Sequence, residues 1–138
     1  MVSDKIIKEL ADVFSFLKKE DILAVLVFGS LAKEEEYVGD TDICIVAPEM
    51  KSKDVLRKVF GNVDVKGKNL DVYCFEELPL NLKWEVIFNH KIVWAGDEAE
   101  LGEYFYFFRK LYDDQKHRMK ISREEILKML EKHKSQSK

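Results

Sequence analysis

The sequence predicts a single α/β domain. Its 138 residues are 46% hydrophobic, which is enough to bury one sizeable core and little more. Segments with helical hydrophobic spacing alternate with short apolar runs rich in β-branched residues, and these patterns are typical of helices and of buried strands. The sequence shows neither an internal repeat nor a low-complexity linker. We therefore expect residues 1–138 to form one domain.

The first third of the chain predicts a helix followed by two strands. Five apolar residues recur at three-to-four spacing, as on one face of a helix: Ile6, Leu10, Val13, Phe14 and Leu17. Ser3 lies where the N-cap of this helix is expected. The apolar run ILAVLVF, residues 22–28, suits a strand covered on both faces, and Gly29 ends it. After a short helical segment, a second strand is predicted over 42–47, before Pro48.

The middle of the chain predicts two further helices and two further strands. The segment SKDVLRKVFG predicts a short helix that stops at Gly61. The segment NLDVYCF, residues 69–75, predicts the third strand. Pro79 can open another helix that runs to about Asn89. Residues 91–96, KIVWAG, then supply a short fourth strand.

The C-terminal part predicts a helical extension over about 97–134. Asp97 and Glu100 resemble a capping box, and Ser122 with Glu125 forms a second one. Between the boxes, large apolar residues form one helical stripe: Leu101, Tyr104, Phe105, Phe108, Leu111 and Tyr112. We expect this stripe to be core or a subunit contact rather than a platform for stacking bases. Association with a second copy or with a partner protein is therefore expected.

Charge and composition limit the class of substrate. Charged residues make up 36% of the chain, but the net charge is only −3, so no basic field is available to hold a long nucleic acid. A small molecule or a protein is the favoured substrate. No apolar run has the length of a signal peptide or of a membrane span. We therefore expect a cytoplasmic protein that has no membrane segment.

The stretch VFGSLAKEEEYVGDTDICIV, residues 27–46, carries two aspartates one residue apart. Because side chains alternate along a strand, Asp40 and Asp42 point to the same side. Two converging carboxylates repel each other unless a hard cation such as Mg²⁺ lies between them. Asp71, in the next predicted strand, becomes a third ligand if the two strands are neighbours. The pattern predicts a metal site.

A Gly-Ser pair precedes these aspartates. A glycine at a strand-to-helix turn lets backbone N–H groups approach an anion, so Gly29 and Ser30 could hold phosphates. Lys33, one helical turn further on, could add a positive charge to the same phosphates. Acidic ligands opposite a phosphate site are typical of metal-assisted displacement at phosphorus, in which two cations hold the attacking and leaving oxygens.

The two cysteines test this arrangement. Cys44 shares the face of Asp42, whereas Cys74 points away from the face of Asp71. If the aspartates converge, the thiols lie on opposite faces of the sheet and cannot form a disulfide. Free thiols agree with a reducing cytoplasm.

Together these motifs resemble the minimal nucleotidyltransferases of the DNA polymerase β superfamily. Members have a hydrophobic strand, Gly-Ser, roughly ten residues, Asp-x-Asp with a second hydrophobic strand, and a third aspartate in a later strand. Here the pattern is VFGS, nine residues, DTDICIV and LDVY, and the resemblance covers about residues 5–112, the expected core. It implies the polymerase β-like fold, a small mixed β-sheet flanked by helices.

The resemblance also implies an activity. Such enzymes transfer a nucleoside monophosphate from a nucleoside triphosphate to an acceptor hydroxyl, with Mg²⁺ and release of pyrophosphate. By resemblance, Asp40 and Asp42 are metal ligands, and Asp71 is a ligand or the base for the acceptor. Gly29 and Ser30 would hold the triphosphate. ATP is the donor expected from the family, since no stretch of the chain distinguishes adenine from guanine.

Three interpretations of the biological role stay open. The favoured one is an antitoxin that modifies a HEPN-domain partner protein on a tyrosine, as small members of the family do. The second is an enzyme that modifies a small molecule, although such relatives usually carry an added substrate domain. The third is a non-catalytic module that neutralises a partner by contact, against which the three aspartates argue. For His90, His117 and His133 we expect surface or capping roles rather than catalysis.

Overall fold

The protein is built around a four-stranded mixed sheet. The computed structural model describes residues 4–29 and 41–116. The strands are β1 (Ala24–Phe28), β2 (Thr41–Val46), β3 (Leu70–Cys74) and β4 (Lys91–Ala95), in the order β3-β2-β1-β4. β1 pairs antiparallel with β2 and β4, whereas β2 pairs parallel with β3. The predicted α/β class and the small mixed sheet are confirmed.

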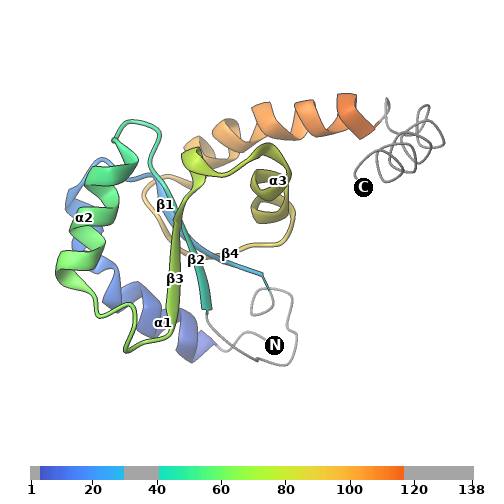
Figure 1. Ribbon diagram of the computed structural model, residues 1–138. Coiled ribbons are helices and arrows are strands. Elements are labelled where there is room, and N and C mark those ends of the chain that lie inside the picture. Colours follow the sequence, from blue (N-terminus) through green and yellow to red (C-terminus); the bar gives the residue numbers. More distant parts are fainter. Residues whose placement is uncertain (1–3, 30–40, 117–138) are drawn as a thin grey trace, which may run out of the picture.

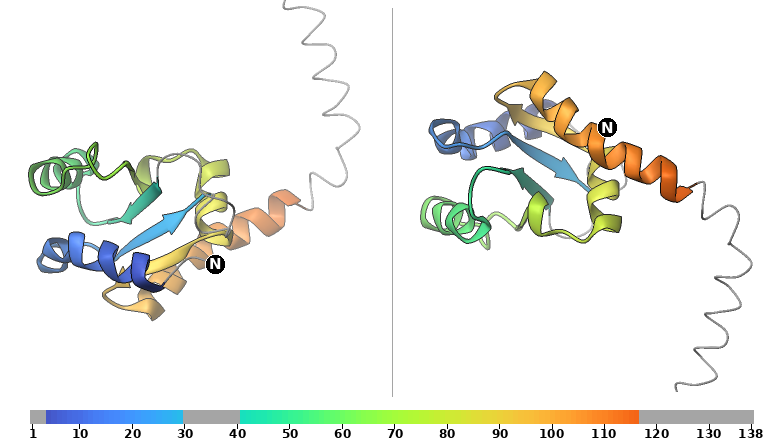
Figure 2. Two further views of the ribbon diagram at one scale, coloured as in Figure 1. Left: turned by 90° about the horizontal axis from the view of Figure 1, so that it is seen from below. Right: turned by 90° about the horizontal axis from the view of Figure 1, so that it is seen from above.

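Helices cover both faces of the sheet (Figure 1 and Figure 2). One face carries α1 (Asp4–Val13) and α2 (Ser52–Asn62), and the other carries α3 (Leu80–Phe88) and a helix over residues 98–116, called the C-terminal helix below. Alternate β1 side chains enter the two cores, with Val25 and Val27 toward α1 and α2 and Leu26 toward α3. All five β1 residues are buried, as predicted for a strand covered on both faces.

The first helix is shorter than predicted. α1 ends at Val13, and a 3₁₀ segment, η1 (Ser15–Lys19), replaces its expected last turn. The Ser15 hydroxyl donates to the Asp12 backbone oxygen at 2.8 Å, and this bond competes with continuation of the α-helix. Phe14 and Leu17 are nevertheless fully buried, because 3₁₀ geometry keeps residues three apart on one side. The predicted cap, Ser3, lies outside the described residues.

The predicted stop of α2 at Gly61 is wrong by one residue. The helix runs to Asn62, whose side-chain amide donates to the Lys58 oxygen at 2.7 Å. Val63 then leaves the helix in an extended conformation and is buried in the core. Burial of this valine, rather than the freedom of the glycine, sets the helix end.

The remaining strands and α3 lie close to their predicted positions. β1 begins two residues later than predicted and β2 begins and ends one residue earlier. β3 is one residue shorter at each end, because Asn69 has a positive φ of 54° and Phe75 begins the 3₁₀ segment η2 (Phe75–Glu77). α3 follows Pro79 as expected. His90 Nδ1 lies 2.9 Å from the Val86 oxygen at the end of α3, in the capping role expected for it.

The C-terminal helix begins with the predicted cap. Asp97 Oδ1 accepts hydrogen bonds from the N–H groups of Ala99 at 2.9 Å and Glu100 at 3.2 Å, which satisfies two donors of the first turn. Leu101 and Phe105 from the predicted stripe are buried against the sheet. The second predicted capping box, at residues 122–125, lies outside the described residues, as do His117 and His133. None of the helices that the structure describes is long and apolar enough to span a membrane.

The two cysteines lie on opposite faces of the sheet, as predicted. Cys44 belongs to the core beneath α3, and Cys74 to the core beneath α1 and α2. Both are free and buried. Burial raises the pKa of the Cys44 thiol above its ordinary value, so this cysteine is a poor nucleophile.

Candidate active site

Gly29 and Asp42 meet at the end of β1. Phe28, the last residue of β1, pairs with Asp42 in the β1–β2 register, and Gly29 follows with a φ of +78°. A Cβ atom at residue 29 would lie 2.5 Å from Asp42 Oδ2, a distance that real Cβ contacts do not reach. The backbone angle therefore favours glycine here, and a Cβ atom could be admitted only if the Asp42 carboxylate moved. The structure brings these two predicted site residues together.

Asp71 lies beside Asp42. The two aspartates are direct partners in the parallel β2–β3 pairing, so their side chains point to the same face of the sheet. Both are half-buried. The end of β1 and the starts of β2 and β3 lie together at the lower edge of the sheet in Figure 1. The condition on which Asp71 joins the predicted site, that its strand is a neighbour of the strand carrying Asp42, is met.

The other predicted site residues lie outside the described part of the chain. These are Ser30, Lys33 and Asp40, so their roles stay predictions. Within residues 4–29 and 41–116, no group of three acidic, histidine or cysteine side chains is arranged to hold a metal ion. The predicted metal site also contains Asp40. Its place in that site rests on the sequence spacing alone.

Two aromatic residues beside the aspartates were not predicted as part of the site. Tyr73 follows Asp71 by two residues on the same strand, is 39% exposed, and packs edge-on against Phe28 with ring centroids 5.7 Å apart. Strand alternation in LDVY puts Tyr73 on the face of Asp71, so the signal was present in the sequence. The pairing with Phe28 depends on the order of the strands, which the sequence pattern does not contain.

A half-buried carboxylate, that of Glu76, lies at the opposite end of β3. Glu76 Oε1 accepts a hydrogen bond from the Ala47 N–H at 3.1 Å, and Oε2 accepts one from the Tyr104 hydroxyl at 3.0 Å. Burial raises the pKa of Glu76, and burial together with the nearby Glu76 raises the pKa of Tyr104. Glu76 follows β3 whereas Asp71 is near its start, so this group joins elements rather than serving the acidic site.

Residues 8–99 match the family described as polymerase beta, nucleotidyltransferase. The chain belongs to this nucleotidyltransferase family. MJ1547 of Methanocaldococcus jannaschii, provisionally named a protein adenylyltransferase, is 39% identical over 100 residues, which cover 72% of this chain and 76% of that protein. Repair DNA polymerase X of African swine fever virus is 35% identical over 63 residues, which cover 44% of this chain and 34% of the polymerase.

Solved structures show the same fold as this nucleotidyltransferase. A chain from the complex of a tri-AMPylated HEPN toxin of Shewanella oneidensis with the MNT antitoxin aligns with a TM-score of 0.63 at 12% identity, over 92% of this chain and 99% of that chain. A chain from a crystal structure of a toxin-antitoxin with AMP-PNP aligns with a TM-score of 0.63 at 12% identity, over 83% of this chain and 95% of that chain. These likenesses confirm the polymerase β-like fold.

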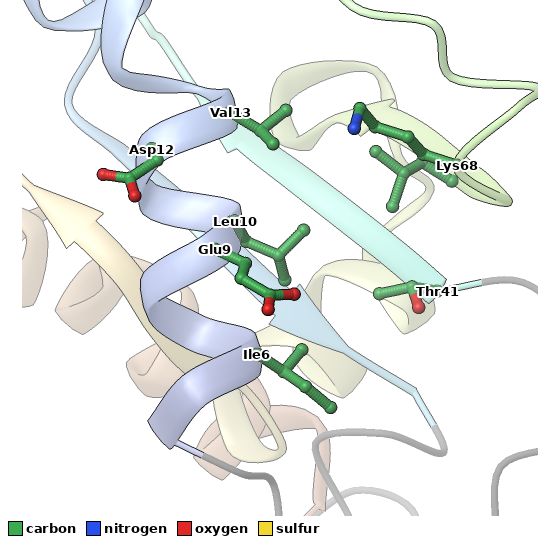
Figure 3. A pocket seen from close by; sticks show the side chains of 8 residues that line it. Ile6, Glu9, Leu10, Asp12, Val13, Thr41 and Lys68 are labelled. Atoms are coloured by element: carbon green, nitrogen blue, oxygen red, sulfur yellow. The ribbon is translucent and has the colours of Figure 1, made fainter.

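Two hollows open near the acidic edge of the nucleotidyltransferase sheet. The first, of about 500 Å³, lies between α1 and the starts of β2 and β3. Figure 3 shows the Glu9 carboxylate pointing toward Thr41 there, while Asp12 points away. Because Thr41 and Asp42 are adjacent in β2, they face opposite sides of the sheet. This hollow therefore does not open onto the carboxylates.

The second hollow, of about 490 Å³, lies along the outer side of β3. Phe60, Val65, Lys66 and Asn69 line it together with Asp71 itself. Of the two hollows, this one reaches a predicted site residue.

Proposed function

We propose that this nucleotidyltransferase moves AMP from ATP to a hydroxyl group of a partner protein. The observation that carries the proposal is the cluster at the acidic edge, where the Asp42 carboxylate occupies the space beside Gly29 and Asp42 pairs with Asp71. The similarity to MJ1547, whose provisional name is protein adenylyltransferase, supports a protein acceptor. The toxin–antitoxin complexes that share the fold support a HEPN-domain protein as that acceptor.

The acidic edge fits Mg²⁺ by its chemistry. Asp42 and Asp71 are neighbouring carboxylates on one face, and oxygen ligands of this kind are those that Mg²⁺ prefers. Gly29 has no side chain to cover the Asp42 oxygen. Asp40 and Asp42 would hold two Mg²⁺ ions, and Asp71 beside them would be a third ligand or the base for the acceptor. When bound, Mg²⁺ offsets negative charge on the phosphate oxygens during transfer.

The residues of the chain have separate roles in the proposed reaction. Backbone N–H groups at Gly29 and Ser30 hold the triphosphate, with Lys33 as an additional positive charge. Asp71 takes the proton from the acceptor hydroxyl. The hydroxyl oxygen bonds to the α-phosphorus, the bond from that phosphorus to the bridging oxygen breaks, and pyrophosphate leaves.

Replacement of Asp71 separates binding from chemistry. Asp71→Asn should slow AMP transfer by about 10² or more, because a neutral amide cannot take the acceptor proton. It should leave ATP binding largely intact, whereas Asp42→Asn should weaken binding of ATP with Mg²⁺. The measurement is label transfer from α-labelled ATP to a co-purified partner, with calorimetry for binding.

Asp113→Asn is the matched control, because Asp113 is exposed on the C-terminal helix. This variant should transfer AMP at the wild-type rate. Transfer at full rate by Asp71→Asn would refute the role of Asp71 as the base. A wild-type chain that transfers nothing yet neutralises its partner would favour the contact-only module instead.

A further inference from the structure

On the outer edge of β3, some backbone N–H and C=O groups make no hydrogen bond to any residue that the structure describes. The Thr41 N–H donates to the Asn69 oxygen at 2.9 Å, and in a parallel ladder alternate residues turn both backbone groups to the same side. Asn69, Asp71 and Tyr73 therefore face β2, and Val72 faces outward. β3 lies at the edge of the sheet, and among residues 4–29 and 41–116 no backbone hydrogen bond outside the strand ladders involves Val72. A short open strand edge thus starts next to Asp71.

The loop before β3 is held firmly beside this edge. The Leu70 N–H donates to the Val65 oxygen at 2.8 Å, and the Gly67 N–H donates to Asp64 Oδ1 at 3.0 Å. Asn69 has a φ of 54°, a conformation that asparagine adopts more readily than most residues. These bonds fix the wall of the hollow of about 490 Å³ that Asp71 and Val72 also line. The hollow is therefore formed before any ligand arrives.

Phe60 gives the hollow an apolar wall. It lies at the end of α2 with 57% of its surface exposed, and it lines the hollow together with Lys66. A ring left this exposed contributes little to the fold, but it can contact an apolar group of a ligand. Lys66 adds a positive charge at the same place. The hollow therefore offers an apolar contact, a cation and an open strand edge.

We infer that the acceptor is an extended protein segment that pairs with the outer edge of β3 and occupies this hollow. Addition of a strand to an open edge is a recurrent mode of peptide recognition. The acceptor residue opposite Asp71 would point its hydroxyl to the face of that carboxylate. Its two neighbours would then point to the other face, toward Phe60 and the Val72 side chain. This inference rests on the proposed function and adds the class of acceptor.

The geometry predicts a sequence preference. The residue directly before or after the acceptor tyrosine should be apolar, because it contacts Phe60. Acidic residues nearby should be favoured, because Lys66 is positive. A free tyrosine should be a poor acceptor, because it has no backbone to pair with Val72.

The test uses the full chain with Mg²⁺, α-labelled ATP and a library of end-blocked heptapeptides with a central tyrosine. Phe60→Ala should lower kcat/KM for the accepted peptides by about tenfold. The control is Phe107→Ala, the same change at a phenylalanine that is 61% exposed on the C-terminal helix, which should leave the value unchanged. Val72→Pro removes the outward N–H together with the valine side chain, and it should also reduce transfer.

Nuclear magnetic resonance gives a readout that needs no chemistry. In the ¹⁵N-labelled chain, an accepted peptide should protect the Val72 amide from hydrogen exchange. Undiminished transfer by both Phe60→Ala and Val72→Pro would overturn the inference while leaving the proposed function standing. Protection of Val72 without any label transfer would support the docking site and refute the proposed function. An unprotected Val72 amide with an accepted peptide present would overturn the docking site.

Discussion

Gly29 is the residue whose replacement the structure constrains most clearly. Gly29→Ala would place a methyl group against Asp42 Oδ2 at a φ of +78°. We expect this change to lower the free energy of unfolding by about 1–3 kcal/mol. It should also weaken binding of ATP with Mg²⁺, because the Asp42 carboxylate must move. Urea unfolding and calorimetry measure the two effects.

Gly102→Ala is the matched control for that change. A Cβ atom at Gly102 meets nothing within 4 Å, and the residue lies in the C-terminal helix. Alanine there should raise the free energy of unfolding by about 0.5–1 kcal/mol. If both alanine variants gained stability alike, the close approach of Gly29 to Asp42 would be refuted.

At the residue scale, the sequence predicted which side chains share a face but not which strands are neighbours. Strand alternation relates Asp40 to Asp42, and its application to β3 would also have found Tyr73. The contact of Phe28 with Tyr73 and the pairing of Asp42 with Asp71 both need the strand order. Hydrophobic patterns are local, so they do not contain the order of the strands. From the sequence, Asp71 could therefore join Asp42 only on the condition that their strands are neighbours.

At the element scale, Glu76 holds three parts of the chain together. Its carboxylate accepts hydrogen bonds from the N–H of Ala47, which follows β2, and from the hydroxyl of Tyr104 in the C-terminal helix. The Lys83 ammonium of α3 donates to the Glu76 backbone oxygen at 3.4 Å. Burial raises the pKa of Glu76 above its ordinary value of 4.5. The folded state therefore holds the proton more tightly than the unfolded state does. The stability from this difference is fully present below pH 4.5 and is lost as the pH rises through the raised pKa.

Glu76→Gln should remove this pH dependence, because glutamine stays neutral. Relative to wild type, the variant should gain free energy of unfolding as the pH rises from about 4.5 to 8. Urea unfolding across that range is the measurement. Glu77→Gln, at the exposed neighbouring residue, should keep the wild-type dependence. If the free energy of unfolding changed with pH in the same way for wild type and Glu76→Gln, burial of the Glu76 carboxylate would not raise its pKa.

The boundaries of the elements follow tertiary contacts that local patterns do not contain. The spacing of apolar residues predicted one helix through Leu17, but the Ser15 hydroxyl bond to Asp12 favours the 3₁₀ segment. Burial of Val63, rather than Gly61, ends α2. The N-cap at Asp97 was predicted well, because capping chemistry involves only residues close in sequence.

At the scale of the whole molecule, the C-terminal helix runs beside α3 (Figure 2), and both helices carry exposed aromatic residues. Phe107 is 61% and Phe88 is 49% exposed. Phe88 contacts Tyr112 with ring centroids 4.7 Å apart, and Phe107 contacts Phe108 at 5.2 Å. The predicted stripe itself is buried or half-buried, so the exposed aromatic surface consists of Phe107 and Phe88, which lie beside the stripe.

We expect this surface to make the isolated chain self-associate. Sedimentation velocity at rising concentration should show a larger species, and Phe107→Glu should weaken the association by about tenfold or more. Phe60→Glu, at a phenylalanine of α2 that is 57% exposed, should leave it unchanged. A wild-type chain that stays strictly monomeric at high concentration would contradict this expectation.

The position of β1 between β2 and β4 has a consequence for synthesis on the ribosome. β1, β2 and β3 are complete once Cys74 has been made, so Asp42 and Asp71 can already be paired. The second edge of β1 stays unpaired until β4 has been made, because Ala24 of β1 pairs with Ala95 of β4. An uncovered edge of a buried, apolar strand invites pairing with other chains. The strands that carry the acidic edge are therefore all synthesised before the strand that covers the second edge of β1.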